Sequence, residues 1–267
     1  MKTAGAKNDC RKLLGQIAVI TGGGHGIGRS IAGRFQKEGA RICLIDCDHE
    51  AGEAAARELT GNDPTMAPVF VYADLARPEQ IRVAAATVER VFGRVDILVN
   101  NAGIEAEKPF AEISVECWDS VIAVNLRAPF LLTQALLPLF PPEGGCIINI
   151  SSIHATHAFP DSTAYACSKT GLVALSRNLA LELAPRHIRV NAICPGYIDT
   201  RMWDNYLRRS PDANQLEAQT TALHPIGRRG MPADVAETAL FLATESSSFM
   251  TGTQLVVDGG LTIRAHP

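Results

Sequence analysis

Hydrophobic residues along this chain gather into short runs that alternate with longer stretches of mixed polarity. Seven short runs are apolar throughout instead of alternating, which is typical of parallel strands covered on both faces. They occupy residues 16–21, 41–46, 68–74, 96–101, 146–152, 188–194 and 254–259. Helices are expected between them, over residues 27–39, 50–59, 78–93, 115–140, 164–185 and 232–247.

The regular alternation of strand and helix, without a linker rich in Pro, Ser or charge, predicts a single doubly wound α/β domain. We expect a seven-stranded parallel sheet with helices on both faces, a Rossmann domain, over residues 15–267. Residues 1–14 carry scattered charges and no apolar stretch, which predicts a solvated tail and not a signal peptide. Residues 199–231 form one long irregular connection, which predicts a substrate lid; a plain surface excursion is the alternative.

Composition narrows the classes of function. With 267 residues, 46% of them hydrophobic, the chain can bury a full core. A net charge of −3 offers no general attraction to nucleic acid, and no run approaches the roughly 18 apolar residues of a membrane span. The seven cysteines lack CxxC spacing and several lie in apolar strands, which favours a reducing, cytoplasmic setting. The seven histidines show no ligand spacing, so no metal site is expected.

Glycines concentrate in the turn after the first predicted strand. The stretch TGGGHGIGRS, Thr21 to Ser30, has five glycines in seven positions, and its spacing of Gly22, Gly26 and Gly28 differs from the common GxGxxG. Such a turn removes Cβ atoms from the backbone, lets a pyrophosphate approach and points the N–H groups of the next helix at the anion. It predicts a dinucleotide site, although a purely structural turn can also be rich in glycine.

The second predicted strand ends in a carboxylate, Asp46, eighteen residues after Gly28. A carboxylate at this place accepts hydrogen bonds from both adenosine ribose hydroxyls and repels a 2′-phosphate, which favours NAD over NADP. Cys47 brings no cation for a phosphate, whereas His25 leaves the use of NADP open. The alternative for Asp46 is a solvated residue at the end of a strand.

A tyrosine and a lysine stand four residues apart in YACSK, so Tyr165 and Lys169 share one face of a helix. This helix follows the fifth predicted strand, at the carboxyl edge where α/β sheets bind ligands. Free tyrosine, with a pKa of about 10, is a poor base, and a nearby ammonium is expected to lower that pKa. Ser151 and Ser152 end the fifth strand, where a hydroxyl can hold a substrate oxygen against Tyr165.

These motifs together resemble the short-chain dehydrogenase/reductase family. From about residue 15 to residue 261, the chain carries in the family's order TGGGHGIG, NNAG, INISS, YACSK and PGYIDT. The resemblance implies reversible hydride transfer between an alcohol and a nicotinamide cofactor, with Ser152 orienting the substrate and Tyr165 as general acid/base. It further implies that Lys169 lowers the pKa of Tyr165 and holds the nicotinamide ribose. Asn125 would support a water-linked proton relay to Lys169.

The resemblance also implies contacts with the cofactor, NAD with NADP as an option. Asp74 would accept from the adenine amine, Asn101 and Gly103 would line the ribose, and the turn after the sixth strand would cover the nicotinamide. The full set is Gly22, Gly24, His25, Gly26, Ile27, Gly28, Asp46, Asp74, Leu75, Asn101, Ala102, Gly103, Tyr165, Lys169, Pro195, Gly196, Ile198 and Thr200. Taken singly, Asp74 has a strand cap as its alternative, Thr200 a helix N-cap and Asn125 a core amide.

The expected substrate is a small-molecule alcohol or ketone. Glu105 after NNAG and His154 after Ser152 resemble the glucose 1-dehydrogenases and related sugar dehydrogenases of the family. Both side chains could hydrogen-bond a polyhydroxy substrate; the alternative is that both face solvent. Tyr197 and Trp203 are expected to wall the pocket, with packing of Trp203 beneath the lid as the alternative.

Two other functions stay open. A 3-oxoacyl-(acyl-carrier-protein) reductase has the same motifs, although Asp46 disfavours its usual NADPH, and Arg127 and Arg177 are too few for a docking patch. A catalytically silent NAD-binding sensor or scaffold is the other alternative, although such family members generally lack the tyrosine or the lysine. Members commonly form homotetramers through two long helices, here near 114–140 and 163–184, and the C-terminal strand, and we expect the same.

Overall fold

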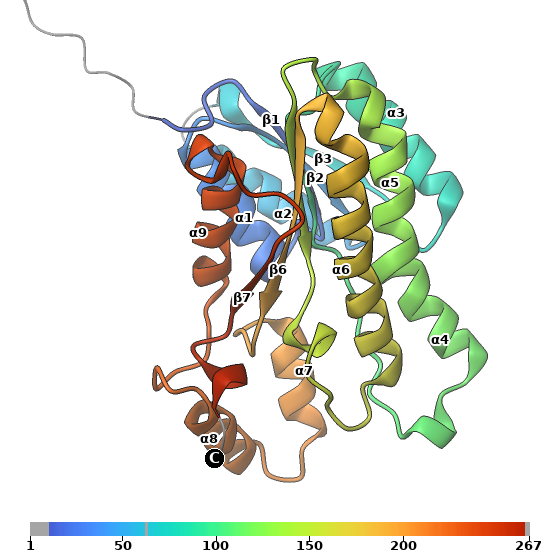
Figure 1. Ribbon diagram of the computed structural model, residues 1–267, viewed down its shortest axis with the longest axis vertical. Coiled ribbons are helices and arrows are strands. Elements are labelled where there is room, and N and C mark those ends of the chain that lie inside the picture. Colours follow the sequence, from blue (N-terminus) through green and yellow to red (C-terminus); the bar gives the residue numbers. More distant parts are fainter. Residues whose placement is uncertain (1–10, 62–63, 265–267) are drawn as a thin grey trace, which may run out of the picture.

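A seven-stranded parallel sheet forms the centre of the computed structural model, which describes residues 11–61 and 64–264 (Figure 1). Its strands are β1 (Ile17–Thr21), β2 (Arg41–Asp46), β3 (Val69–Tyr72), β4 (Ile97–Asn100), β5 (Gly145–Ile150), β6 (Ile188–Pro195) and β7 (Gln254–Val257). They are ordered β3-β2-β1-β4-β5-β6-β7, and every neighbouring pair is parallel. The chain therefore reverses its winding between β1 and β4, which confirms the predicted doubly wound fold.

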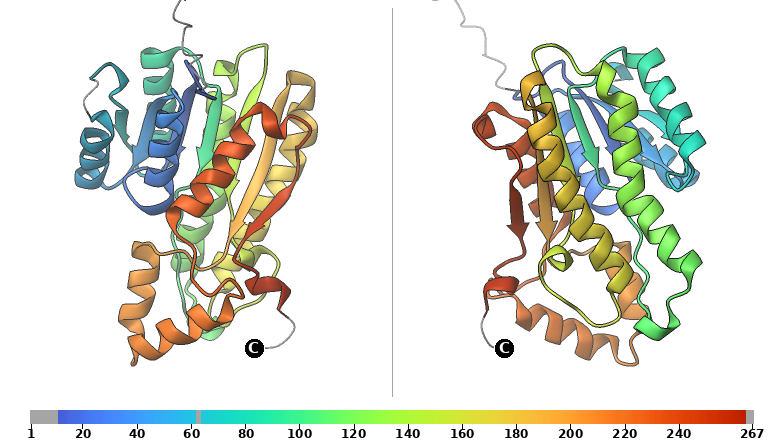
Figure 2. Two further views of the ribbon diagram at one scale, coloured as in Figure 1. Left: turned by 90° about the vertical axis from the view of Figure 1, so that its left-hand side faces the viewer. Right: turned by 45° about the vertical axis from the view of Figure 1, so that its right-hand side comes forward.

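Helices cover both faces of the sheet (Figures 1 and 2). One face carries α1 (Gly26–Lys37), α2 (His49–Thr60) and α9 (Pro232–Ala243); the other carries α3 (Pro78–Phe92), α5 (Ala128–Leu136) and α6 (Thr163–Leu183). A further helix, α4 (Val115–Ile122), runs beside α6, and α7 (Arg201–Arg209) and α8 (Ala213–Leu223) lie beyond the carboxyl ends of the strands. The short 3₁₀ turns are η1 (Pro64–Met66), η2 (Phe110–Glu112), η4 (Leu137–Leu139), η5 (Ile153–Ala155), η6 (Ala184–Arg186), η7 (Glu245–Ser247) and η8 (Leu261–Ile263).

The two faces hold separate hydrophobic cores because successive strand residues point to opposite sides. In β1, Ala18 and Ile20 pack with Ile31 of α1 and Ala239 of α9, whereas Val19 packs into the other core, and all five are fully buried. Strands buried on both faces need apolar residues at every position, which is the pattern that the sequence shows.

The predicted helix 115–140 is interrupted in the middle. A single π-helical turn, η3 (Ala123–Arg127), separates α4 from α5 and contains Asn125. By length and composition alone the stretch Val115–Leu139 could cross a membrane, but 44% of its most apolar window is buried inside the fold. The stretch packs against α3 and α6, which is what the core helix of a globular α/β domain does.

Two boundaries differ from the sequence-based expectation. Of the expected tail, residues 1–10 lie outside the described residues, whereas Leu13 is fully buried in the core beside α1, so packing begins before Gly15. Residues 199–231 are not irregular: they fold into α7 and α8. The ends of this 199–231 segment meet, because Asp199 N–H donates to Gly230 O over 2.9 Å and the two flanks form a β-bridge.

Candidate active site

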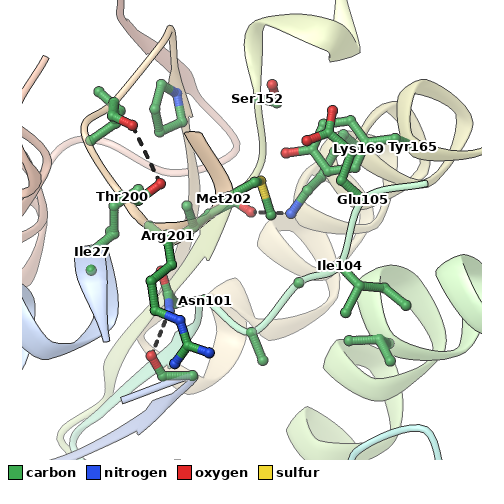
Figure 3. Close-up of a pocket in the computed structure, with 18 of the residues that line it drawn as sticks. Ile27, Asn101, Ile104, Glu105, Ser152, Tyr165, Lys169, Thr200, Arg201 and Met202 are labelled. Atoms are coloured by element: carbon green, nitrogen blue, oxygen red, sulfur yellow. Dashed lines mark hydrogen bonds between the residues drawn. The ribbon is translucent and has the colours of Figure 1, made fainter. Parts of the chain in front are cut away.

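A cavity of about 950 Å³ opens at the carboxyl ends of the strands, between the sheet and α7 (Figure 3). We call its two parts the glycine half and the tyrosine half. The glycine half lies around Gly22, Gly26, Asp46, Asp74 and Asn101; the tyrosine half lies around Ser152, Tyr165, Lys169, Glu105, His154, Tyr197 and Trp203. The site therefore sits where the winding of the sheet reverses, as expected for a doubly wound fold.

The glycine turn has a backbone that requires glycine at two of its positions, Gly22 and Gly28. Gly22 has a φ of +64°, in the left-handed region that favours glycine. A Cβ on Gly28 would lie 2.2 Å from Gly22 O and 2.5 Å from Asn101 Nδ2. The turn thus folds back tightly onto the start of α1. This tight fold leaves its outer side, lined by Gly22 and Gly26, open to the cavity.

The N-terminus of α1 faces this cavity without a side-chain cap. Gly26 and Ile27 of its first turn line the cavity, and His25 at the N-cap position makes no capping hydrogen bond. The first N–H groups of a helix have no partner within it and attract an anion. The residues present can therefore hold a phosphate group at this point.

A carboxylate marks the end of the glycine half. Asp46 lines the cavity at the end of β2, and its Oδ2 accepts from Gly24 N–H over 2.9 Å. Its Oδ1 accepts from Asp48 N–H over 3.0 Å, which fixes the carboxylate in place. Asp74, after β3, lines the same half and accepts from Ala76 N–H over 2.9 Å. These are fixed acceptors for hydroxyl or amine donors of a ligand.

Tyr165 and Lys169 are both buried on one face of α6, in the tyrosine half. Lys169 Nζ donates to Ile150 O over 2.9 Å and lies 5.5 Å from the centre of the Tyr165 ring. Ser151 Oγ donates to Lys169 O, so Ser151 is occupied by the backbone of α6. Ser152 lines the cavity beside Tyr165, and its hydroxyl is the one that acts on the pKa of the phenol.

The pKa of Tyr165 is set mainly by burial. Burial raises it above the usual value, the Glu105 charge raises it further, and only the hydrogen bond with Ser152 lowers it. Burial also lowers the pKa of Lys169 to about 8. In the chain without coenzyme, desolvation of the phenol therefore outweighs any effect of the nearby ammonium, and the lowering of this pKa by Lys169 together with the bound coenzyme stays a prediction.

Asn125 lies behind the site instead of lining it, and its side chain is fully buried. Its Oδ1 accepts from Ile104 N–H and its Nδ2 donates to Ile104 O, both over 2.9 Å. Nδ2 also donates to Ser168 Oγ over 3.0 Å, and Ser168 Oγ donates to Tyr165 O over 2.7 Å. The amide therefore joins the loop after β4 to α6, and the water-linked relay to Lys169 stays a prediction.

Aromatic and acidic side chains surround the tyrosine half. The His154 ring stacks on Phe159 at 4.1 Å between ring centres and meets the Tyr165 ring edge-on at 5.2 Å. Burial lowers the pKa of His154 to about 4, so this imidazole is neutral at pH 7. Burial and then Glu107 raise the pKa of Glu105 to about 7. Trp203 is buried against Tyr197, at 5.5 Å between ring centres.

The cavity gathers most of the predicted site residues. All four expected substrate residues line it, as do Ser152 and every expected cofactor residue except Gly24 and Gly28, which shape the turn from behind. Thr200 lines it and also caps α7, accepting from Trp203 N–H. The sequence reasoning missed Arg201, Glu107 and Phe159, which line the cavity as well. Among residues 11–61 and 64–264, no three His, Cys, Asp or Glu side chains come together to hold a metal ion.

Comparison with known proteins agrees with this geometry. A family model described as enoyl-(acyl carrier protein) reductase matches residues 22–262. D-threitol dehydrogenase of Mycolicibacterium smegmatis is 38% identical over 258 residues, covering 95% of each chain. A 3-oxoacyl-(acyl-carrier-protein) reductase of Thermotoga maritima is 37% identical over 255 residues, 94% of this chain and 100% of the relative. The crystal structure of levodione reductase superposes with a TM-score of 0.90 at 30% identity, covering 95% of this chain and 100% of that one.

This chain belongs to the short-chain dehydrogenase/reductase family. It is an NAD(P)-dependent oxidoreductase that acts on alcohols or ketones. The glycine half suits the dinucleotide, since it offers Cβ-free backbone, an uncapped helix start and the Asp46 carboxylate in one cavity.

Proposed function

We propose that this chain transfers hydride between NAD(H) and a secondary alcohol or its ketone, with a sugar or polyol as the alcohol. The observation that carries the proposal is the convergence of Ser152, Tyr165 and Lys169 in a cavity that also contains the glycine turn and Asp46. The preference for NAD over NADP rests on Asp46, whose carboxylate would accept from the ribose hydroxyls and repel a 2′-phosphate.

In the proposed reaction, the substrate oxygen lies between the hydroxyls of Ser152 and Tyr165. A nicotinamide coenzyme held in the cavity would supply the hydride acceptor for the carbinol carbon in oxidation and the hydride donor for the carbonyl carbon in reduction. Tyr165 Oη takes the hydroxyl proton in oxidation and gives a proton to the carbonyl oxygen in reduction. Because the Tyr165 pKa is raised, the phenol holds its proton in the chain alone. Proton uptake therefore needs the added positive charge of the oxidised coenzyme.

Lys169 would act on both Tyr165 and the coenzyme. With a pKa of about 8 it carries a proton at pH 7, and one of its N–H groups is engaged by Ile150 O. Its remaining donors can reach the nicotinamide ribose. Asn125, through Ile104 and Ser168, holds the loop after β4 and α6 at the spacing that this arrangement needs.

The choice of a polyhydroxy substrate rests on the polar groups of the tyrosine half. Glu105 forms no hydrogen bond or ion pair within the described residues, and Nδ1 of His154 and Nε1 of Trp203 are buried without a partner there. Several convergent polar groups on aromatic walls suit a compact substrate with more than one hydroxyl. The similarity to D-threitol dehydrogenase agrees with this choice. The detailed likeness to glucose 1-dehydrogenases stays a prediction.

A coenzyme and substrate screen tests the proposal. Reduction of NAD⁺ and of NADP⁺ is followed by nicotinamide absorbance with sugars, polyols, cyclic and simple secondary alcohols, and steroids. We expect turnover with NAD⁺ and a polyol or sugar. The similarity to a 3-oxoacyl-(acyl-carrier-protein) reductase makes that activity the second candidate. Activity with NADPH and acyl thioesters alone would replace our proposal with it.

We also infer that the protein assembles as a homotetramer. Apolar side chains are exposed on the two helices expected at the interface, including Phe130 on α5 and Leu181 on α6, and on β7 at Val256. Exposed apolar surface of this kind marks contact sites between proteins. The mass in solution, measured by light scattering, should be four times that of the 28.6 kDa chain; a monomeric mass would rule the tetramer out.

A further inference from the structure

The helix α7 lies across the cavity and is tied down at both ends. Its first residue, Arg201, pairs with Asp48 at the start of α2, with 3.2 Å between Nη1 and Oδ2. Near its last turn, Arg209 pairs with Glu107 in the loop after β4, with 3.5 Å between Nη1 and Oε2. One ion pair thus holds α7 beside the glycine half and the other holds it beside the tyrosine half.

The pair in the glycine half includes the phosphate-binding turn itself. His25, which precedes α1, has its Nε2 3.1 Å from Asp48 Oδ2, and Arg201 Nη1 contacts the same ring nitrogen. Arg201 therefore reaches from the 199–231 segment to the side of the uncapped start of α1, and it lines the cavity together with Gly26 and Ile27 (Figure 3). A guanidinium at this position can bond an oxyanion with two N–H groups.

Asp48 engages this guanidinium in the chain alone. Hydrogen bonds from Ala51 N–H, His25 and Arg201 lower its pKa to about 2, so Asp48 is ionised at pH 7. Both partners are partly exposed, with 61% of the Arg201 side chain and 39% of the Asp48 side chain accessible. An exposed ion pair of this kind is weak and exchanges readily for a better anion. A phosphate that binds at the start of α1 would be that anion.

We propose that Arg201 is a coenzyme clamp, which leaves Asp48 for a phosphate of the bound dinucleotide and so ties the start of α7 to the coenzyme. The proposal rests on the proposed function, since it needs a dinucleotide in the glycine half. It assigns to Arg201 a positioning role, because the same helix carries Trp203 of the tyrosine half. The phosphate is either the pyrophosphate of both coenzymes or the 2′-phosphate of NADP alone.

Calorimetric titration of NAD⁺ and NADP⁺ into the full chain tests the phosphate contact. Arg201→Gln should raise the coenzyme Kd about tenfold, as expected for the loss of a charged hydrogen bond. Equal weakening for both coenzymes identifies the pyrophosphate, and weakening for NADP⁺ alone identifies the 2′-phosphate. Arg208→Gln, on the same helix and bonded only to Asn205 among the described residues, is the matched control and should change neither Kd.

Asp48→Asn sharpens the test because asparagine keeps the N-cap of α2 while removing the competing charge. Asp48 is that cap, accepting from Ala51 N–H over 3.1 Å. The freed guanidinium should then bind the coenzyme up to about fivefold more tightly. Weaker binding in this variant would contradict the exchange.

The surroundings of α7 are followed through the fluorescence emission of Trp203, the third residue of this helix. A Trp118→Phe background removes the only other tryptophan of the sequence. Adding the coenzyme whose binding Arg201→Gln weakens should shift the Trp203 emission in the parent and not in Arg201→Gln. If the parent binds no dinucleotide, both the proposed function and the clamp are overturned. If the parent binds a dinucleotide and Arg201→Gln binds both NAD⁺ and NADP⁺ within twofold of the parent, with the same emission shifts, only the clamp is overturned.

Discussion

In the glycine half of the cavity, backbone and polar side chains bond to one another, whereas the tyrosine half contains buried polar atoms with no partner in the described residues. The Asp46 carboxylate accepts from Gly24 N–H of the glycine turn and from Asp48 N–H, and Asn101 Nδ2 donates to Thr21 O of β1. By contrast, the four buried side-chain atoms without a partner are Nδ1 of His154, Nε1 of Trp203, Nε2 of His224 and Nη1 of Arg229.

All four of these residues lie in or next to the tyrosine half. His154 and Trp203 line it, Arg229 stacks 4.8 Å above the Trp203 ring, and His224 meets the Tyr197 ring at 6.1 Å. Buried polar groups are nearly always paired in folded proteins. In the glycine half the protein therefore satisfies the side chains of Asp46 and Asn101 and leaves the backbone N–H groups at the start of α1 for a phosphate. In the tyrosine half, polar atoms of a substrate can reach the side chains of His154 and Trp203, which line the cavity.

The largest effect that tests the division of the cavity into two halves is expected on the catalytic rate. Tyr165→Phe removes the proton donor and acceptor of the tyrosine half, and we expect kcat to fall about a thousandfold, within the usual range for a general acid/base. Coenzyme Kd should stay within twofold, since Tyr165 is not part of the glycine half. Steady-state kinetics and calorimetry measure the two quantities. A kcat within tenfold of the parent would remove Tyr165 from the reaction.

The next effect is on the shape of the glycine half. In Gly28→Ala the new Cβ would clash with Gly22 O at 2.2 Å, so the turn must shift and coenzyme affinity should fall at least tenfold. The free energy of unfolding should fall by about 1–3 kcal/mol, as for an overpacked site. Gly33→Ala is the matched control on the same helix, because its Cβ meets only the flexible end of Leu59 at 3.1 Å. If Gly28→Ala and Gly33→Ala had the same coenzyme affinity and the same free energy of unfolding, the turn would accommodate the new Cβ and the prediction would be wrong.

The sequence predicts the sheet and the glycine half well because both depend on local patterns. The expected strand 41–46 has the same bounds as β2, since a run that is apolar at every position is unambiguous when both faces are covered. The glycine turn and the pair Tyr165 and Lys169 follow from spacing within one turn or one helix. Parallel strands then bring their carboxyl ends together without further information.

The 199–231 segment and the electrostatics of the tyrosine half could not be predicted to the same extent. In α8, Thr220 is the one buried residue, so the sequence has no apolar periodicity that would predict this helix. The residues that cap α7 and α8, Thr200 and Asp212, are of the types that favour helix N-caps. The pairing of Arg201 with Asp48 joins residues 153 positions apart, and no local pattern encodes such a contact. The raised pKa of Tyr165 was missed because burial, unlike a neighbouring lysine, cannot be read from spacing.

A smaller effect should follow from loosening the 199–231 segment. Arg229 is 10% exposed, pairs with Asp199 at 2.6 Å and with Glu217 at 3.0 Å, and so joins both ends of the segment to α8 behind Trp203. Arg229→Leu should raise substrate KM severalfold and leave coenzyme Kd unchanged, with a loss of about 1–2 kcal/mol in unfolding free energy.

Arg228→Leu is the control for that variant, because the neighbouring Arg228 pairs with Asp234 outside the segment. It should leave substrate KM within twofold of the parent. If Arg229→Leu changed coenzyme Kd as much as substrate KM, the two halves would not be independent and the division described above would fail.

The smallest expected effect is a pH dependence located in the tyrosine half. The pKa of Glu105 is raised to about 7 from an unfolded value near 4.5. Between these pH values the folded protein holds a proton on Glu105 that the unfolded chain releases. The free energy of unfolding therefore falls as pH rises through this range. Glu105→Gln removes this loss. Its Tm relative to the parent should therefore be higher at pH 8 than at pH 5, by roughly 2 °C for each kcal/mol. The exposed Glu112→Gln should show the same Tm difference at both pH values, and if Glu105→Gln did likewise, the carboxyl would be solvated and the tyrosine half open to water.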